Sequence, residues 1–488
     1  MSIISVNNLT FSYDGSYDYI FENVSFQIDT DWKLGFIGRN GCGKTTFLNL
    51  LRGKYEYRGT ISSSVEVDYF PFEVEDKDQS TLDVVYSIAG NLELWRLKKE
   101  LSKLELDEDV LYQPYCLLSN GEQTKVLLAA LFQRDNNFLL IDEPTNHLDM
   151  KARQVVGNYL KNKKGFILVS HDREFLNNCV DHILAINKTT IEVQKGNFST
   201  WWSNKENRDR FEQAQNAKLK NEIKELTAAA RRTANWSAKI EKGKIGSGVY
   251  DRGYVGHKAA KMMKRSKSLE ARRQKAIAVK ETLLKDLEIA ESLTVSPLTY
   301  HKRRLAEVRD LSIFYGEKEI CRDINLEIER GDRIALIGKN GCGKTSILKL
   351  LLGQNLTYRG ELNIGNKLII SYVPQDTSFL KGNLRDFALA GGIDESLFKT
   401  ILRKLDFPRV QFEKDMQDFS AGQKKKVLLA QSLCRQAHLY IWDEPLNFID
   451  VLSRMQIEDV IVSCQPTMLF VEHDISFVHT VATKKLYL

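Results

Sequence analysis

The sequence predicts an α/β protein in which two similar domains are joined by a long α-helical hairpin. Three observations support this fold class. Motif blocks recur in the same order in the two halves of the chain, short apolar runs precede the repeated glycine-rich block, and the segment between the halves is highly charged and poor in proline. A repeat of whole motif sets indicates duplicated domains, and the charged segment favours helices.

The internal repeat consists of four blocks. The glycine-rich residues 38–46 return as residues 338–346, and the blocks LSNGEQ, LLIDEPTNHLD and LVSHD return as FSAGQK, LYIWDEPLNFID and FVEHD. The offset is 300 residues at the glycine-rich block and 302 at the block with the histidine. Because the spacing is almost constant, we predict two domains, residues 1–203 and 301–488, with a connector over residues 204–300.

The connector is predicted to form two helices that fold back on each other. It is rich in Lys, Arg, Ala, Glu and Leu, and it has no proline before Pro297, which favours long helices. Five glycines from Gly243 to Gly256 predict a reversal of the chain, so we place the tip at about residues 241–257. We expect two helices of about 35 residues each, near 50 Å long. A solvated charged linker is the alternative.

The charge of the chain is concentrated in this connector. Residues 231–280 hold 15 Lys and Arg against 3 Asp and Glu, a net charge of +12, so the rest of the chain carries −6 although the whole carries +6. A basic segment between acidic halves is typical of a protein that binds a phosphate backbone. The side chains that we expect to contact RNA are Lys244, Tyr250, Arg252, Tyr254, His257, Lys258, Lys261, Lys264 and Arg265. The tyrosines could stack on bases or pack the hairpin.

Composition excludes a membrane-spanning protein. With 43% hydrophobic and 27% charged residues, the 488-residue chain has no apolar run of about 18 residues, the length that crosses a bilayer. Its first residues lack a basic stretch followed by an apolar one, which argues against secretion. We therefore expect a cytoplasmic protein.

The glycine-rich block has the spacing GxxxxGK[ST] of a P-loop, in which backbone N–H groups surround phosphates at a helix N-terminus. Lys44 and Lys344 would neutralise the β- and γ-phosphates, and Thr45 and Thr345 would hold Mg²⁺. We therefore predict ATP and Mg²⁺ as cofactors. The residues expected at ATP are Gly38, Asn40, Gly41, Gly43, Lys44, Thr45 and Thr46 in the first copy, and Gly338, Asn340, Gly341, Gly343, Lys344, Thr345 and Ser346 in the second.

An Asp-Glu pair follows an apolar run in each half, where a buried strand would end. We assign Asp142 and Asp443 to the metal, and Glu143 and Glu444 to orienting or deprotonating the attacking water. An acidic turn after a strand is the alternative.

One histidine in each half also follows an apolar run. His171 and His473 could hydrogen-bond a γ-phosphate from the end of a strand. Either histidine alone reads more readily as structural, but its place in the repeat favours a catalytic role.

Residues 119–123 (SNGEQ) and 420–423 (SAGQ) resemble the signature motif of ABC ATPases. The resemblance implies two domains that face head to tail within one monomer, with each ATP held between the P-loop of one domain and the signature of the other. The signature residues that it implies at ATP are Ser119, Gly121, Glu122, Ser420, Gly422 and Gln423. Tyr13 and Tyr315 match the aromatic residue that stacks on adenine, with a core or turn tyrosine as the alternative.

The two halves depart differently from the ABC pattern. Gln375 matches the metal-binding glutamine of the family, but the first half has Phe72 at that place, which puts metal coordination at the first site in doubt. In the second half, Leu446 and Phe448 replace a threonine and a histidine of the first. Because both glutamates are present, we predict two active but unequal sites.

Two such domains on one chain, joined by a charged helical connector, resemble the ABC-F family, whose members bind the tRNA exit site of the ribosome. The resemblance implies the bacterial ribosome as partner, through 23S rRNA and P-site tRNA, with no DNA and no membrane. The tip sequence GSGVYDRGYVGHKAAKMMKR and the short first domain resemble the antibiotic-resistance branch of Lsa and Vga type. That branch implies protection against lincosamides, pleuromutilins and streptogramin A by displacement of the drug. A housekeeping ABC-F translation factor and the ATPase subunit of a transporter are the alternatives.

Overall fold

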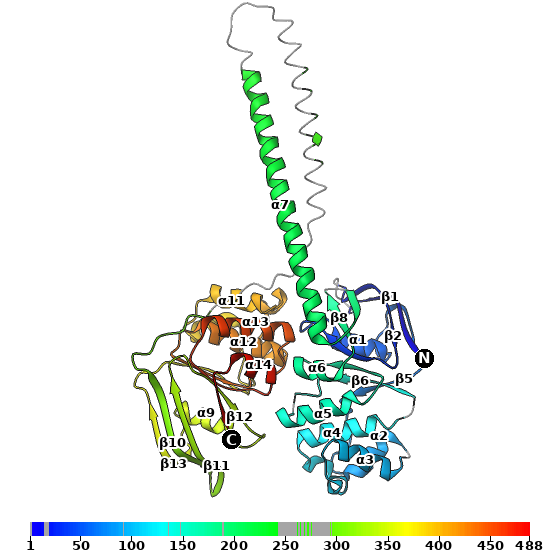
Figure 1. Ribbon diagram of the computed structural model, residues 1–488, viewed down its shortest axis with the longest axis vertical. Helices are drawn as coiled ribbons and strands as arrows, with labels where there is room; N and C mark the ends of the chain where they lie inside the picture. The colour runs from blue at the N-terminus through cyan, green and yellow to red at the C-terminus, as the bar shows by residue number, and fades with distance from the viewer. Residues whose placement is uncertain are drawn as a thin grey trace, which may run out of the picture. The chain divides into compact units, whose positions relative to one another are not determined.

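A computed structural model gives the fold. It describes residues 2–13, 19–90, 92–134, 136–146, 148–187, 190–242, 293 and 295–488, with single positions at Lys261, Lys264, Ser268, Ala271, Arg272 and Lys275. The chain divides into two compact units. The larger comprises Met1–Trp201 and Ala290–Leu488, and the smaller comprises Trp202–Ile289. The larger unit contains two α/β domains of similar topology (Figure 1).

The first domain combines a small antiparallel sheet with a larger, mostly parallel one. The small sheet has the order β2 (Phe21–Asp29), β1 (Ile3–Phe11), β4 (Arg58–Ser62). The large sheet has the order β5 (Glu66–Phe70), β6 (Asn137–Asp142), β7 (Phe166–Val169), β3 (Lys33–Ile37), β8 (His182–Asn187), β9 (Thr190–Lys195). The helices are α1 (Lys44–Leu51), α2 (Thr81–Ala89), α3 (Leu94–Lys103), α4 (Asn120–Leu131), α5 (Met150–Lys161) and α6 (Arg173–Cys179). Helices α2, α3 and α4 pack together at one side of this domain (Figure 1).

The second domain repeats this plan. Its antiparallel sheet has the order β11 (Lys318–Glu329), β10 (Arg304–Tyr315), β13 (Thr357–Ile364). Its parallel sheet has the order β14 (Ile370–Val373), β15 (Leu439–Asp443), β16 (Met468–Val471), β12 (Arg333–Ile337), β17 (Lys484–Tyr487). The helices are α9 (Lys344–Leu351), α10 (Leu384–Ala390), α11 (Glu395–Lys404), α12 (Ala421–Cys434), α13 (Val451–Cys464) and α14 (Ile475–Val481). Strands β15 and β16 of this sheet are buried along their whole length, as expected of inner strands of a parallel sheet, whereas the edge strand β17 is mostly exposed.

Helix α1 follows the P-loop and is held between the two sheets of the first domain. Phe47 on α1 lies 5.9 Å from Phe21 and 5.4 Å from Phe36, measured between ring centroids. Gly43 caps the helix at a φ of 99°, and a Cβ there would lie 2.5 Å from the Ile20 side chain. The left-handed backbone and the close contact together require glycine. The core therefore fixes the position of the P-loop.

Helix α7 (Phe198–Lys242) is longer than predicted. It has 45 residues where about 35 were expected, and it begins before residue 204. Phe198 and Trp201 are buried in the first domain, so the helix starts inside the domain core and continues into the connector. The predicted tip, residues 241–257, lies outside the described residues apart from the last two positions of α7.

Glu100 on α3 ties the helical part of the first domain to α5. Its carboxylate accepts hydrogen bonds from Lys103 (2.7 Å), Lys163 (2.5 Å) and the Tyr159 hydroxyl (2.6 Å). Burial alone would raise the pKa of Glu100, but these three donors outweigh it and lower the pKa to about 2.

We predict that Glu100→Gln lowers the free energy of unfolding by about 2 kcal/mol, because it removes a charged acceptor from a buried cluster. A lowered folded-state pKa stabilises the protein above the unfolded value of 4.5. The difference between wild type and variant should therefore shrink as the pH falls from 4.5 toward 2. Urea unfolding at several pH values measures it. Glu93→Gln, at an exposed pair with Arg96, should change stability by less than about 0.5 kcal/mol.

Candidate active site

Each P-loop lysine lies over its own loop. Lys44 Nζ donates to the carbonyls of Gly38 (2.8 Å) and Arg39 (3.0 Å). Lys344 Nζ donates in the same way to Gly338 and to the following carbonyl, at 2.8 Å each. Both ammonium groups are thus held at the mouth of a glycine loop, where the phosphates of a nucleotide fit.

The metal-assigned aspartates end strands β6 and β15, each next to an edge strand of its sheet. Asp142 Oδ2 accepts from the hydroxyls of Thr45 (3.2 Å) and Tyr69 (3.0 Å). Both carboxylate oxygens of Asp443 are buried with no hydrogen-bond partner among the described residues, and burial raises the pKa of Asp443 to about 6. Such buried oxygens, beside a P-loop hydroxyl, fit the hard oxygen ligands that Mg²⁺ prefers.

The adjacent glutamates pair with the predicted histidines in both domains. His171 Nε2 lies 3.2 Å from Glu143 Oε1, and His473 Nε2 lies 3.4 Å from Glu444 Oε1. Glu143 and Glu444 both have a positive φ, 51° and 46°. This left-handed backbone is uncommon outside glycine and tends to occur at functional sites.

The environments of the two glutamates differ. Glu444 Oε2 accepts from the side-chain amides of Gln375 (2.8 Å) and Asn447 (2.7 Å). Burial would raise the pKa of Glu444, but contacts with His473 and Gln375 outweigh it and lower the pKa. For Glu143, burial and the neighbouring Asp142 raise the pKa to about 8. Glu444 therefore has two amide donors in addition to its histidine, whereas Glu143 has only the histidine contact among the described residues.

The first cavity, of about 550 Å³, is shared by the two domains. The first domain contributes P-loop residues, Asp142, Glu143 and His171, and the second contributes its signature residues. The predicted site residues that line it are Tyr13, Asn40, Gly41, Gly43, Lys44, Thr45, Thr46, Asp142, Glu143, His171, Ser420, Gly422 and Gln423.

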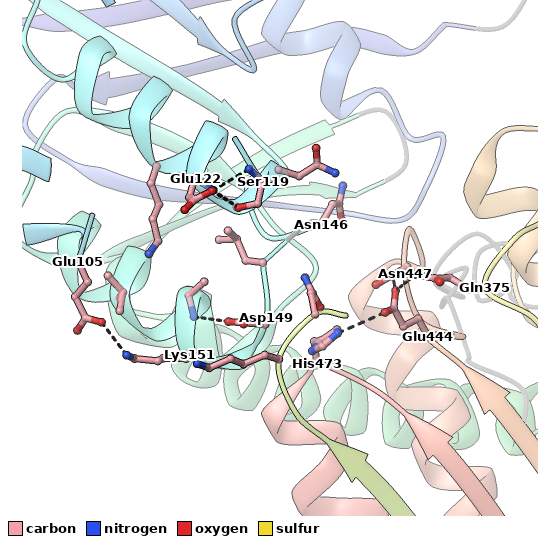
Figure 2. Close-up of a pocket in the computed structure, with 18 of the residues that line it drawn as sticks. Glu105, Ser119, Glu122, Asn146, Asp149, Lys151, Gln375, Glu444, Asn447 and His473 are labelled. Atoms are coloured by element: carbon pink, nitrogen blue, oxygen red, sulfur yellow. Dashed lines mark hydrogen bonds and ion pairs between the residues drawn. The ribbon is translucent and has the colours of Figure 1, made fainter. Parts of the chain in front are cut away.

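The second cavity, of about 730 Å³, is the reciprocal one. Figure 2 shows Ser119 and Glu122 of the first domain across the cavity from Gln375, Glu444 and His473 of the second. The predicted residues that line it are Ser119, Gly121, Glu122, Asn340, Gln375, Glu444 and His473. The remaining predicted residues of the second P-loop, with Tyr315 and Asp443, lie in the second domain outside this lining.

The signature serines cap the helices that point into these cavities. Ser119 caps α4 and Ser420 caps α12, each in a capping box with the residue three positions on. A helix N-terminus presents free backbone N–H groups and a partial positive charge, which favours a phosphate. Each cavity therefore has a P-loop on one wall and a helix N-terminus on the other.

Direct contacts between the domains support this arrangement. Asn40 Nδ2 donates to the Phe448 carbonyl at 2.6 Å, and Arg173 pairs with Glu458. A Cβ on Gly422 would lie 2.6 Å from that same carbonyl and 3.0 Å from Asn40. The signature glycine thus lets Asn40 of the first domain approach the second domain closely.

The two tyrosines assigned to adenine each contact their P-loop helix. The Tyr13 hydroxyl lies 2.8 Å from Thr46 Oγ1, and Ser346 Oγ lies 3.4 Å from the Tyr315 hydroxyl. Their side chains are 44% and 47% exposed, so a ring face is available to a base.

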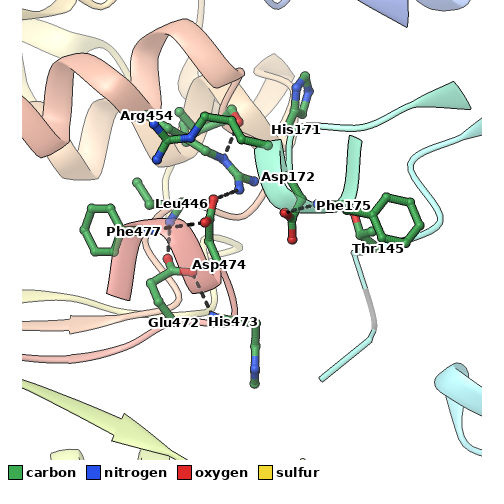
Figure 3. Close-up of polar contacts among 12 residues, drawn as sticks. Thr145, His171, Asp172, Phe175, Leu446, Arg454, Glu472, His473, Asp474 and Phe477 are labelled. Carbon is green, nitrogen blue, oxygen red and sulfur yellow. Dashed lines mark hydrogen bonds and ion pairs between the residues drawn. The ribbon is translucent and has the colours of Figure 1, made fainter. Parts of the chain in front are cut away.

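The replacement of a threonine by Leu446 comes with a new hydrogen-bond partner for the loop (Figure 3). In the first domain, the hydroxyls of Thr145 and Ser170 lie 3.3 Å apart. In the second, Leu446 is buried in the core, and its backbone N–H donates to Glu472 at 2.8 Å. The Glu472 carboxylate of the second domain thus stands in place of the Thr145–Ser170 hydroxyl pair of the first, and it accepts the loop N–H of Leu446.

Sequence reasoning missed Tyr69 and Glu472. Tyr69 contacts Asp142, 73 residues along the chain, and Glu472 accepts from the Leu446 N–H, 26 residues away. The position of a tyrosine near the end of both β5 and β14 was the signal for Tyr69. Phe72 is 38% exposed and lines neither cavity. Of the predicted RNA-contacting residues, Lys261 and Lys264 are described as helical and exposed, and the others lie outside the described residues: Lys244, Tyr250, Arg252, Tyr254, His257, Lys258 and Arg265.

Comparison with protein families gives one match, the ABC transporter family, over residues 21–146 and 321–447. The two matches together cover more than half of the chain. The chain belongs to the ABC transporter family. The predicted fold class, two tandem ABC ATPase domains in an α/β fold, is confirmed, and the enzymatic activity of such domains is ATP hydrolysis. Within the described ranges, every helix is too short or too polar to cross a lipid bilayer.

Two bacterial relatives match this ABC protein over nearly its whole length. It is 28% identical to "Ribosome protection protein VmlR" of Bacillus subtilis, covering 99% of this chain and 86% of that one. It is 27% identical to "ATP-binding protein Uup" of Escherichia coli, covering 99% and 80%. Among solved structures, the archaeal ribosome recycling factor aABCE1, in complex with the stalk protein aP1, has a TM-score of 0.65 at 20% identity, covering 98% of this chain and 87% of that one. That likeness shows the shared fold.

The unequal surroundings of Glu143 and Glu444 predict unequal turnover. We expect Glu143→Gln, which leaves the second site intact, to retain about fivefold more ATPase activity than Glu444→Gln, since a net hydrogen bond contributes about 1 kcal/mol. Steady-state phosphate release at saturating ATP and Mg²⁺ measures both, with the double variant as background. Equal residual rates would contradict the predicted asymmetry.

Proposed function

We propose that this chain is an ABC-F ATPase that binds the bacterial ribosome and protects it from antibiotics at the peptidyl-transferase centre. The observation that carries the proposal is the connector. Residues 231–280 have a net charge of +12 between two ATPase halves, where a phosphate-rich surface is the natural partner. Similarity over 99% of the chain to a ribosome protection protein supports the same reading.

The length of the connector suits a site deep in RNA. Helix α7 has 45 residues, which corresponds to about 68 Å at 1.5 Å per residue. A helix of that length can carry a basic tip far from its first turn. We propose that residues 204–300 form a hairpin that enters the tRNA exit and P-site region, with its tip at about residues 241–257.

In this proposal, the ATPase sites drive a cycle of domain closure and opening. ATP in either cavity would touch both domains, so binding would close them and hydrolysis would release them. Mg²⁺ would be held by Thr45 and Asp142 in the first site, and by Thr345, Asp443 and Gln375 in the second. Closure would fix the orientation of the connector toward 23S rRNA and P-site tRNA, and drug would leave when the tRNA is displaced.

A housekeeping ABC-F translation factor is the second candidate. Similarity to Uup of Escherichia coli, at 27% identity over 99% of this chain, favours it as much as the similarity to VmlR favours protection. Both candidates share the ATPase sites and ribosome binding, so they differ only in the outcome on the ribosome. The third candidate, the ATPase subunit of a transporter, does not explain why the connector is basic.

Ribosome binding is tested with the Glu143→Gln/Glu444→Gln double variant. It binds ATP without turnover, so we expect it to co-sediment with 70S ribosomes in ATP and to be released in ADP. Wild type under ATP turnover is the control for transient binding. Failure of the double variant to co-sediment in ATP would reject both ABC-F candidates.

A second experiment tests drug protection. Expression of the wild-type chain in a susceptible bacterium should raise the inhibitory concentration of lincosamides, pleuromutilins and streptogramin A, whereas the double variant should not. If the chain binds ribosomes but does not change the drug response, the protection proposal is rejected and the housekeeping translation factor becomes the favoured function.

A further inference from the structure

Lys425 is a buried lysine that the duplicated motifs do not explain. It lies on α12 with only 2% of its surface exposed, and its Nζ donates to the Pro374 carbonyl at 2.9 Å. Gln375, the next residue, donates to Glu444 at 2.8 Å. Lys425, Gln375 and Glu444 all line the second cavity. One buried side chain thus holds the loop that orients the glutamate.

The first domain has no equivalent of this contact among its described residues. Thr124 stands at the place of Lys425, and its hydroxyl donates within α4, to the Asn120 carbonyl at 2.9 Å. The loop opposite carries Phe72 in place of the glutamine. The second domain therefore has both Lys425 and Gln375, and the first domain has neither a lysine nor a glutamine at the equivalent positions.

Burying an ammonium group costs several kcal/mol unless charges and hydrogen bonds offset it. Burial lowers the pKa of Lys425, while Glu472, Asp443 and Glu444 oppose that shift. Glu472 is 3% exposed and stands where the first domain has Ser170. The second domain thus carries an extra buried cation together with an extra buried anion. A loop needing only to be packed could use a neutral residue, as the first domain does.

Lys425 also belongs to the helix that serves the other site. Ser420 caps α12 and lines the first cavity together with Lys44. Ser420 and Lys425 are five residues apart, about 7.5 Å along the axis. Most of α12 is buried in the core of the second domain, so the helix moves as one body. A shift of the signature at the first cavity is therefore carried to the Pro374 carbonyl.

We propose that Lys425 is a positioning residue that links the two ATP sites: it joins the signature helix, which closes the first cavity, to the loop whose Gln375 orients Glu444 in the second. Nucleotide at the first site draws α12 toward the first P-loop, and through Lys425 it aligns Glu444. Coupling runs in this direction because Thr124 provides no such link from the second cavity to Glu143.

The direct test measures turnover at the second site alone. In a Glu143→Gln background, we expect Lys425→Met to lower kcat at least fivefold with little change in the KM for ATP, because Glu444 loses its orientation while the P-loop is untouched. Lys425→Arg, which keeps a charged donor, should restore most of the rate. Lys424→Thr, at the neighbouring partly exposed lysine of α12, is the matched control and should leave the rate unchanged.

A double-mutant cycle tests the link between sites. In the same background, Lys44→Ala empties the first site and should lower second-site turnover about fivefold, a typical coupling between sites. In the presence of Lys425→Met, Lys44→Ala should have no further effect.

Two results would overturn the proposal. One is equal second-site turnover with lysine and methionine at position 425. The other is a double variant whose loss of rate equals the product of the losses caused by Lys425→Met and Lys44→Ala. Such independence would mean that the sites communicate by another path. A melting temperature measured in parallel shows whether a lower rate with Lys425→Met comes from misfolding instead of lost positioning. Because no ribosome is present in these assays, failure of the ribosomal proposal leaves this one standing.

Discussion

The closeness of a P-loop in one domain to a signature helix in the other is the constraint on which the rest of the structure depends. A triphosphate carries several negative charges, and each cavity offers helix N-termini and lysines to neutralise them from two walls. The walls belong to different domains, so nucleotide binding and domain contact become one event. The Asn40 contact with the Phe448 carbonyl and the close approach at Gly422 show how tightly the walls meet.

The duplicated domains have diverged in charge while the strand and helix plan has stayed the same. In the second domain Gln375 and Asn447 donate to Glu444, Lys425 donates to the Pro374 carbonyl, and Glu472 accepts from the Leu446 N–H. Among the described residues of the first domain, buried Glu143 has no such amide donors, and burial raises its pKa. Two sites with different electrostatics can hydrolyse ATP one after the other. One site can then control domain closure, and the other can complete the cycle.

Most of the fold and the phosphate-binding part of the site could be predicted from the sequence, because glycine spacing and apolar runs are local signals. The strands that end at Asp142 and Asp443 follow directly from such runs. Tyr69 and Lys425 could not be found in this way, since they contact groups 73 and 51 residues distant. Helix α7 was predicted too short because its first turn is packed on the first domain through Phe198 and Trp201, where the composition still resembles a domain.

The measurement that tests head-to-tail pairing most directly is photocleavage by trapped vanadate. With Lys344→Ala, only the first site retains its P-loop lysine, so ADP and orthovanadate should be trapped there in the presence of Mg²⁺. Ultraviolet light should then cut the chain near Lys44 and near Ser420, and mass spectrometry of the fragments locates both breaks. A second break at Ser119 instead of Ser420 would show that each domain closes on its own nucleotide, and would contradict the account.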